Sequence, residues 1–161
     1  MNDNRQGTAL VTGASSGIGE AFAKELASRN YDLVIIARRK DRLLELVEEL
    51  KSNYSISVDV IPADISTEKG IERVEEYIKK AKNLDLLINN AGFGTKGNFS
   101  DVSSEKSINM INLHVLAATR FCRAVLPDMI KRKKAQSSMY LHSQRFIQLK
   151  VMQFIRLPKP I

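Results

Sequence analysis

The sequence is poor in the residues that form disulfides and metal sites. Its 161 residues include one cysteine, two histidines and no tryptophan. The single Cys122 excludes an internal disulfide, agrees with a reducing compartment, and is more often a small buried hydrophobe than a reactive thiol. No apolar run is long enough to cross a bilayer, and the N-terminus lacks the apolar stretch of a signal peptide. We therefore expect a cytoplasmic protein with no membrane partner and no metal site.

Acidic residues are absent from the C-terminal part of the chain. The formal net charge is +7, but residues 1–130 hold 17 basic and all 18 acidic residues, a net charge of −1. The eight basic residues from Lys131 onward supply +8. The basicity therefore belongs to a tail, and we expect no nucleic-acid partner. This change in composition divides the chain into a patterned part, residues 1–134, and a divergent basic tail, residues 135–161.

Apolar patterns alternate between strand and helix periods along the first part. The patterns predict strands near 7–12, 31–37, 56–62 and 84–89, and helices near 17–29, 39–53, 67–82 and 103–133. Thr67 can cap the third helix. Such alternation predicts an α/β fold with a Rossmann-like, doubly wound parallel sheet in strand order 3-2-1-4.

A glycine-rich turn joins the first strand to the first helix. Three glycines there have three uses, namely a sharp turn, close approach of backbone N–H groups to a pyrophosphate, and close packing of helix on strand. The simpler alternative is that these residues form only a turn, but the flanking strand and helix favour a dinucleotide site. The candidate cofactor-binding residues of this turn are Gly13, Ser15, Ser16, Gly17, Ile18 and Gly19.

Three further motifs follow the next three strands. They are Ala37-Arg38-Arg39, Ala63-Asp64-Ile65-Ser66 and Asn89-Asn90-Ala91-Gly92. With the glycine turn, these four motifs resemble the short-chain dehydrogenase/reductase family over about the first 134 residues. The resemblance implies an oxidoreductase that interconverts a carbonyl and an alcohol by hydride transfer, with a small-molecule substrate. It also implies pairing of helices from two subunits into homo-oligomers, which the divergent tail puts in doubt here.

The resemblance also assigns roles to residues beyond the turn. Asp64 would contact the adenine amino group with the backbone of Ile65 beside it, although Asp64 could equally form a turn or helix cap. Asn90 would brace the central sheet, and Ala91 and Gly92 would leave room for the ribose. Asn112 matches an asparagine that holds a water in the proton relay, with Asn109 as a competitor on the same face. His114 is predicted to be a surface or core residue, and Pro127 to kink or weaken the helix end.

Arginine at the end of the second strand favours NADP over NAD. An acidic residue at this place would accept hydrogen bonds from the ribose 2′-hydroxyl, whereas an arginine suits a 2′-phosphate. Arg38, with Arg39 beside it, therefore predicts an NADP site. The alternative is that both arginines begin a solvated helix face.

The catalytic part of the family pattern is missing. Family members use a serine and a Tyr-x-x-x-Lys pair, but the four tyrosines here are followed four residues later by Ile35, Val58, Ala81 and Gln144. Asn112 is the surviving member of the catalytic set. The chain is therefore predicted to be inactive, and the alternative function is a catalytically dead dinucleotide-binding or regulatory module.

A shifted reading frame offers an origin for the tail. When codons for residues 135–143 start one base earlier, the genetic code permits Gly-Ala-Ile-Ile-Asn-Val-Ser-Ser, the expected strand and serine. Codons across Phe154–Lys159 permit Tyr-Ser-Ala-Thr-Lys in the same frame. We therefore hypothesise a frameshift after about Lys134.

Loss of the fifth strand would leave the fourth strand as a sheet edge and expose the apolar face of helix 103–133. The tail could mimic a basic amphipathic helix, but an incidental sequence is the favoured alternative.

Overall fold

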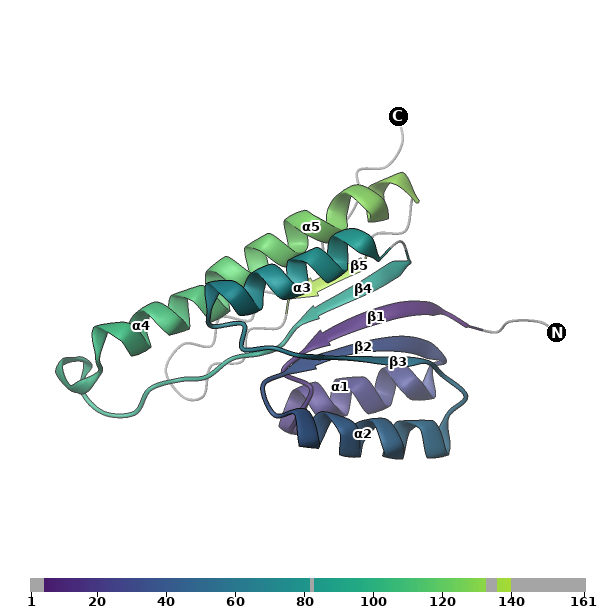
Figure 1. Ribbon diagram of the computed structural model, residues 1–161, viewed down its shortest axis with the longest axis horizontal. Helices are drawn as coiled ribbons and strands as arrows, with labels where there is room; N and C mark the ends of the chain where they lie inside the picture. Colours follow the sequence, from purple (N-terminus) through teal and green to yellow (C-terminus); the bar gives the residue numbers. More distant parts are fainter. Residues whose placement is uncertain (1–4, 82, 133–135, 140–161) are drawn as a thin grey trace.

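A single parallel sheet with helices on both faces organises the computed structural model, which describes residues 5–81, 83–132 and 136–139 (Figure 1). The strand order is β3-β2-β1-β4-β5, so the predicted order 3-2-1-4 is confirmed. Each predicted helix and strand is present with ends within about two residues of the expected ones. The elements are β1 Gly7–Thr12, α1 Gly17–Ser28, β2 Tyr31–Ala37, α2 Lys40–Asn53, β3 Val58–Pro62, α3 Glu68–Lys80, β4 Leu84–Asn89, a short 3-10 helix η1 Phe99–Asp101, α4 Ser104–Ile111, a π-helix η2 Asn112–Ala117, α5 Ala118–Lys131 and β5 Gln136–Met139.

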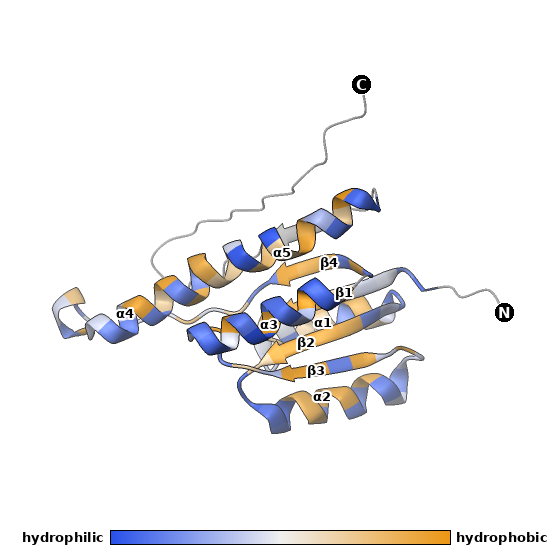
Figure 2. Cartoon of the chain, turned by 45° about the horizontal axis from the view of Figure 1, so that its top comes forward, coloured by the Kyte–Doolittle hydropathy of each residue, from blue (hydrophilic) through white to orange (hydrophobic). Residues whose placement is uncertain are grey.

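The central strands are buried on both faces, which explains their continuous apolar runs. Ala9 and Val11 of β1 pack with α1 and α2, whereas Leu10 between them packs with α3 and α5. Figure 2 shows the apolar strands between helices that each carry a hydrophilic side. Two apolar layers therefore hold the sheet, and its carboxyl edge is left for the connecting loops.

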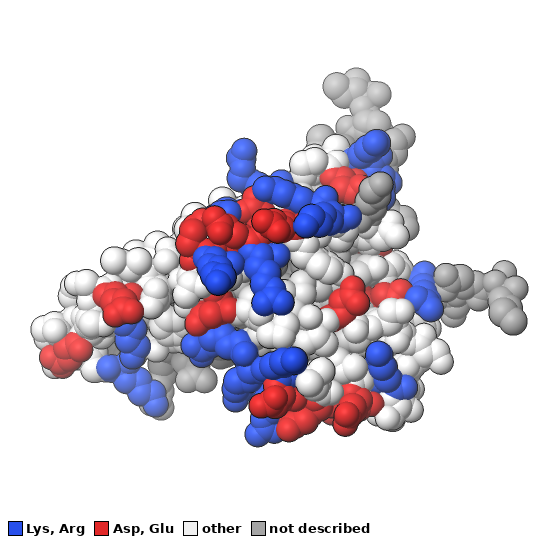
Figure 3. All heavy atoms as spheres, in the orientation of Figure 1, with Lys and Arg blue, Asp and Glu red and all other residues white. Residues whose placement is uncertain are grey.

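Ion pairs join α3 to α5 on the outside of the second layer. Arg120 of α5 donates from Nε to Glu75 at 2.6 Å and also pairs with Glu68. Lys79 reaches Glu75 at 2.6 Å. These partners, Lys79 first, lower the pKa of Glu75 below its ordinary value against the opposing effect of burial. In Figure 3 acidic and basic side chains alternate over this face, so it carries no patch of one sign.

The long C-terminal helix differs in detail from the single helix predicted over 103–133. It consists of α4, a π-helical turn and α5, and it continues past Pro127 to Lys131. Several apolar side chains on it are exposed, namely Ile108, Ile111, Val115, Leu116 and Ile130. Within the described part of the chain, no helix is both long and apolar enough to cross a membrane.

The prediction that β4 forms the edge of the sheet is wrong. Residues Gln136–Met139 form β5, which pairs in parallel with β4 from Leu86 opposite Gln136 to Asn89 opposite Met139. The physical reason is that strand pairing satisfies backbone N–H and C=O groups, which every extended segment carries whatever its side chains. Composition alone therefore could not exclude a strand there. The remaining tail residues lie outside the described residues.

Candidate cofactor site

A cavity of about 490 Å³ lies at the carboxyl edge of the sheet. In open α/β sheets, ligands bind at this edge where the strand order reverses, here between β1 and β4. Eleven of the twelve predicted cofactor residues line the cavity, namely Gly13, Ser15, Ser16, Gly17, Ile18, Arg38, Asp64, Ile65, Asn90, Ala91 and Gly92. The folded chain thus collects four loops from separate parts of the sequence around one hollow.

The three glycines of the turn differ in backbone conformation and in the space around them. Gly13 and Gly17 have φ of +71° and +60°, the left-handed region that side chains rarely adopt. A Cβ on Gly17 would meet nothing within 4 Å, so this residue faces open space. Gly19 is buried behind the cavity, where a Cβ would lie 2.3 Å from the carbonyl oxygen of Gly13. Gly19 therefore serves the packing of α1, and Gly17 leaves room for a ligand.

Helix α1 begins at the cavity with its first N–H groups uncapped by a side chain. Ser16 is the N-cap residue, but its side chain makes no capping hydrogen bond. Its hydroxyl instead accepts a hydrogen bond from Arg39 at 2.8 Å. Free N–H groups and the positive end of the helix dipole attract an anion such as a pyrophosphate.

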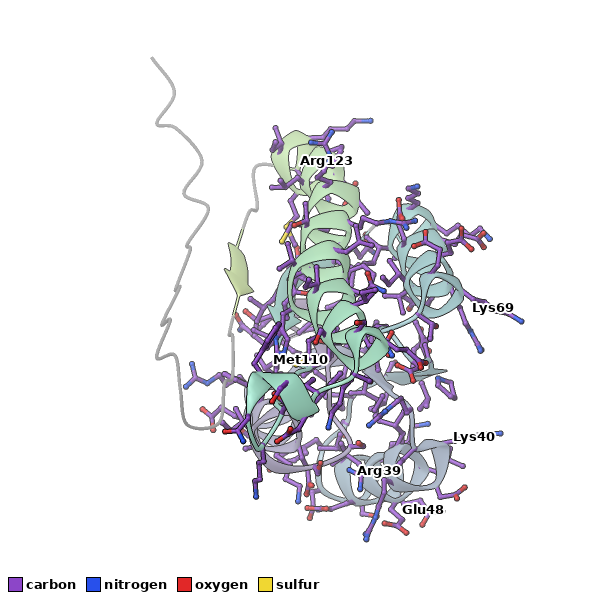
Figure 4. All side chains as sticks on the ribbon, turned by 90° about the vertical axis from the view of Figure 1, so that its left-hand side faces the viewer. Arg39, Lys40, Glu48, Lys69, Met110 and Arg123 are labelled. Carbon is purple, nitrogen blue, oxygen red and sulfur yellow. The ribbon has the colours of Figure 1, made fainter. Side chains whose placement is uncertain are left out.

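Two arginines follow β2, and they lie differently. Arg38 is 70% exposed and approaches Asp64 at 3.8 Å. Arg39, at the start of α2 (Figure 4), donates to the carbonyl and hydroxyl oxygens of Ser15 at 3.3 and 3.1 Å as well as to Ser16. Sequence reasoning placed the phosphate contact on Arg38, whereas in the structure Arg39 closes over the glycine turn. The position of Arg39 directly after Arg38 was the one feature of the sequence that pointed to Arg39 as a second candidate for the phosphate contact.

Asp64 forms the turn between β3 and α3. Its Oδ1 accepts hydrogen bonds from the backbone and hydroxyl of Ser66 at 3.0 and 2.6 Å. Thr67 then caps α3 by accepting from Gly70 N at 3.2 Å, as predicted. The turn role weighed for Asp64 is therefore present, and its Oδ2 remains on the side of Arg38.

A buried threonine, which sequence reasoning did not select, joins the two central loops. Thr12 Oγ1 accepts from the backbone N–H groups of Asn90 and Ala91, both at 3.0 Å. Asn90 Nδ2 donates to the Thr12 carbonyl at 3.0 Å, so Asn90 braces the sheet. Among the described residues, Asn90 Oδ1 is the buried side-chain polar atom that lacks a hydrogen-bond partner. Thr12 is a polar residue at the end of a buried strand, and its hydroxyl therefore needs hydrogen-bond partners. This position in the sequence could have indicated its role.

Asn112 begins the π-helical turn rather than lining the cavity. Its Nδ2 donates to the carbonyl of Ser66, a cavity residue, at 3.2 Å. Single π-helical turns inside α-helices occur frequently at functional sites. His114, two residues later, is partly buried.

No described tyrosine lies near the cavity. Tyr31 begins β2, and Tyr54 precedes β3, so both are at the amino edge. Tyr77 lines a separate hollow at that edge, where burial and a 2.6 Å hydrogen bond to Asp59 raise the pKa of its phenol. A proton donor for a carbonyl would need the opposite edge and a lowered pKa. Tyr140 lies outside the described residues.

The fold and the cavity at its switch point define a Rossmann-like α/β protein. Residues 7–137 match the family profile described as short chain dehydrogenase. This chain belongs to the short-chain dehydrogenase family.

Relatives and solved structures agree with that assignment. The inactive hydroxysteroid dehydrogenase-like protein 1 of Homo sapiens is 34% identical over 128 residues, which are 78% of this chain and 39% of that protein. The NADP-dependent 3-hydroxy acid dehydrogenase of Schizosaccharomyces pombe is 39% identical over 131 residues, 79% of this chain and 50% of the relative. A short-chain dehydrogenase from Sphingobium yanoikuyae in complex with NADPH superposes with a TM-score of 0.80 at 34% identity, covering 83% and 52% of the two chains. The chain thus spans about half or less of these proteins.

Proposed function

We propose that this chain binds NADP(H) in the carboxyl-edge cavity and is the cofactor-binding part of an oxidoreductase for carbonyl and alcohol groups. The observation that carries the proposal is the glycine turn, in which Gly17 faces open space at the uncapped start of α1. The buried, unpartnered Asn90 Oδ1 beside the cavity fits a ligand with hydrogen-bond donors. The residues present therefore fit a dinucleotide, and when bound the nicotinamide would supply a hydride.

Each wall of the cavity is suited to one part of the cofactor. The start of α1, with Gly17 and Ser16, would hold the pyrophosphate. Arg39 would exchange its hydroxyl partners for a 2′-phosphate, and Asp64 would accept from the adenine amino group. Ala91 and Gly92 would leave space for the second ribose. Asn112 would keep the β3 loop in place through its bond to Ser66.

Two arginine variants test the preference for NADP. Charge-assisted hydrogen bonds contribute about 1.5–3 kcal/mol, so NADPH should bind about 10 to 100-fold more tightly than NADH. Arg39→Ala should remove most of this difference, and Arg38→Ala, the matched control in the same loop, should remove less because Arg38 approaches Asp64, whereas Arg39 contacts Ser15 and Ser16 of the glycine turn. Calorimetric titration of the full chain measures both ligands. Tighter binding of NADH by the unaltered chain would reject the phosphate assignment.

We propose further that the chain is catalytically inactive, which favours the alternative of a dinucleotide-binding or regulatory module. The absence of Tyr-x-x-x-Lys from the sequence supports this proposal, and one relative is itself described as inactive. Oxidation of NADPH with a panel of aldehydes and ketones tests it. Robust turnover by cofactor-loaded protein would show that another group supplies the proton.

A frameshift after about Lys134 remains our proposal for the origin of residues 135–161. Two family motifs in one shifted frame support it, and pairing of β5 with β4 does not oppose it because backbone pairing tolerates many sequences. Sequencing the gene across Lys134 decides the question. An authentic reading frame without the shifted motifs would reject the frameshift.

The presence of a single cysteine also supports the proposal that this protein acts in the cytoplasm.

A further inference from the structure

A glycine-rich segment, residues 92–97, leaves the cavity after β4. It contains Gly92, Gly94 and Gly97, and residues 92–96 form neither helix nor strand. Glycine leaves the backbone more freedom than other residues, so this segment has little internal restraint. Its Phe93 nevertheless lines the cavity and packs against the core. Something outside the segment must therefore fix the backbone at Phe93.

The fixing group is the imidazole of His114. Its Nε2 lies 2.9 Å from the carbonyl oxygen of Phe93, and because a carbonyl can only accept, Nε2 carries the hydrogen. The two rings also lie near each other, with centroids 6.4 Å apart. Among the described residues, this is the one hydrogen bond that the backbone of residues 92–97 makes to the rest of the chain.

The same π-helical turn holds both sides of the cavity. Asn112 donates to the carbonyl of Ser66 in the β3 loop, and His114, two residues later, donates to the carbonyl of Phe93 after β4. Leu113 between them lines the cavity itself. The upstream end of the β4 loop is fixed separately, since the N–H of Ala91 donates to Thr12. Loss of the imidazole N–H would therefore free the segment after Gly92 alone.

We propose that His114 is a positioning residue for the nicotinamide half of the cofactor, acting through the carbonyl of Phe93. This inference rests on the proposed NADP(H) binding. The adenosine half would lie over β2 and β3, near Arg39 and Asp64, whereas the nicotinamide half would lie beyond the pyrophosphate, over β4. The wall that His114 fixes is on the nicotinamide side. His114 is not among the residues that line the cavity, so it would act on the cofactor only through Phe93.

The test compares two ligands and three variants of the full chain. His114→Phe keeps a ring beside Phe93 but has no N–H, His114→Gln restores an N–H donor, and Val115→Ala is the control on the exposed side of the same turn. Calorimetry measures NADPH and adenosine 2′,5′-bisphosphate, which lacks the nicotinamide half. His114→Phe should weaken NADPH about tenfold, the effect of one hydrogen bond, and adenosine bisphosphate less than about twofold. His114→Gln should recover most of the loss, and Val115→Ala should change neither ligand.

Limited trypsin digestion gives a readout that needs no cofactor. Lys96 lies in the segment and is exposed, so cleavage after Lys96 should be faster in His114→Phe than in the unaltered chain or in His114→Gln. Equal weakening of both ligands, or unchanged NADPH binding with unchanged cleavage, would overturn the role of His114. Failure of the unaltered chain to bind either ligand would instead reject the proposed function, and faster cleavage would then still establish the tether.

Discussion

Replacing Gly19 of the turn should damage folding, whereas replacing Gly17 should damage binding. In Gly19→Ala the new Cβ would lie 2.3 Å from the carbonyl oxygen of Gly13 and 2.5 Å from Asn90 Nδ2. Ordinary contacts of a Cβ begin near 3.4 Å, so α1 must move away from the Gly13 carbonyl by about an ångström. In Gly17→Ala the Cβ meets no atom within 4 Å, and the cost comes from the left-handed φ of +60° alone.

The strained backbone of Gly17→Ala and the overpacking of Gly19→Ala should lower the stability by different amounts. A left-handed conformation costs an alanine about 1–2 kcal/mol, and overpacking costs about 1–3 kcal/mol or more when backbone must move. For a chain of this size each kcal/mol lowers Tm by about 2–4 °C. Gly17→Ala should therefore lower Tm by about 2–8 °C. Gly19→Ala should lower it further, because its obstacle is backbone that cannot rotate away.

Thermal unfolding followed by circular dichroism measures the stability change, and calorimetric titration with NADPH measures binding to the folded fraction. Gly17→Ala should weaken NADPH more than its small stability loss explains, because its methyl group occupies the space left for the ligand. A Tm of Gly19→Ala within about 1 °C of the unaltered chain would refute the packing role assigned to Gly19. A larger Tm loss for Gly17→Ala than for Gly19→Ala would refute the division of tasks.

Four further variants test a contact beside the site and two contacts elsewhere in the fold. Thr12→Val should leave the backbone N–H groups of Asn90, which is buried, and Ala91, which is partly buried, without their acceptor. The cost is about 1–3 kcal/mol for the buried group and less for the other, and Thr12→Ser should restore stability in chemical denaturation. Because the pKa of Tyr77 is raised, its stabilising effect is complete below pH 10.0 and is lost as the pH rises, so Tyr77→Phe should flatten the alkaline decline of Tm. Because the pKa of Glu75 is lowered, its contribution is present above pH 4.5 and lost as the pH falls, and Glu75→Gln should flatten the acid decline. An unchanged pH profile in either variant would contradict the pKa direction.

Much of the site was predictable because its residues sit at strand ends. Strand and helix periods are local properties, and the carboxyl ends of parallel strands meet at one edge. The glycine turn, Asp64 and Asn90 could therefore be assigned to one cavity from their order alone. Gly19 was predicted as a cofactor-binding residue, and the sequence did not say which of the three glycines serves packing. The structure adds that Gly19 lies behind the cavity wall rather than in it.

The roles that sequence reasoning missed depend on contacts between distant segments. Thr12 joins β1 to the β4 loop 78 residues away, and His114 reaches Phe93 across 21 residues. The choice between two adjacent arginines depended on which side chain turned toward Ser15 and Ser16. The strand β5 was missed because the sequence Gln136-Ser137-Ser138-Met139 gives no strand pattern, whereas its pairing with β4 is a contact between segments distant in the chain.

The sequence by itself determined the elements β1 to α5, the order of the first four strands and the edge at which the cavity lies, because hydrophobic period and loop position are local properties of the sequence. It also shows that the chain holds no Tyr-x-x-x-Lys pair. Only the tertiary structure decided which polar groups meet: Arg39 over the glycine turn, Thr12 beneath the β4 loop, and His114 against Phe93. Those partners come together when the two apolar layers pack on the sheet, and packing across the sheet is not encoded in the spacing of neighbouring residues.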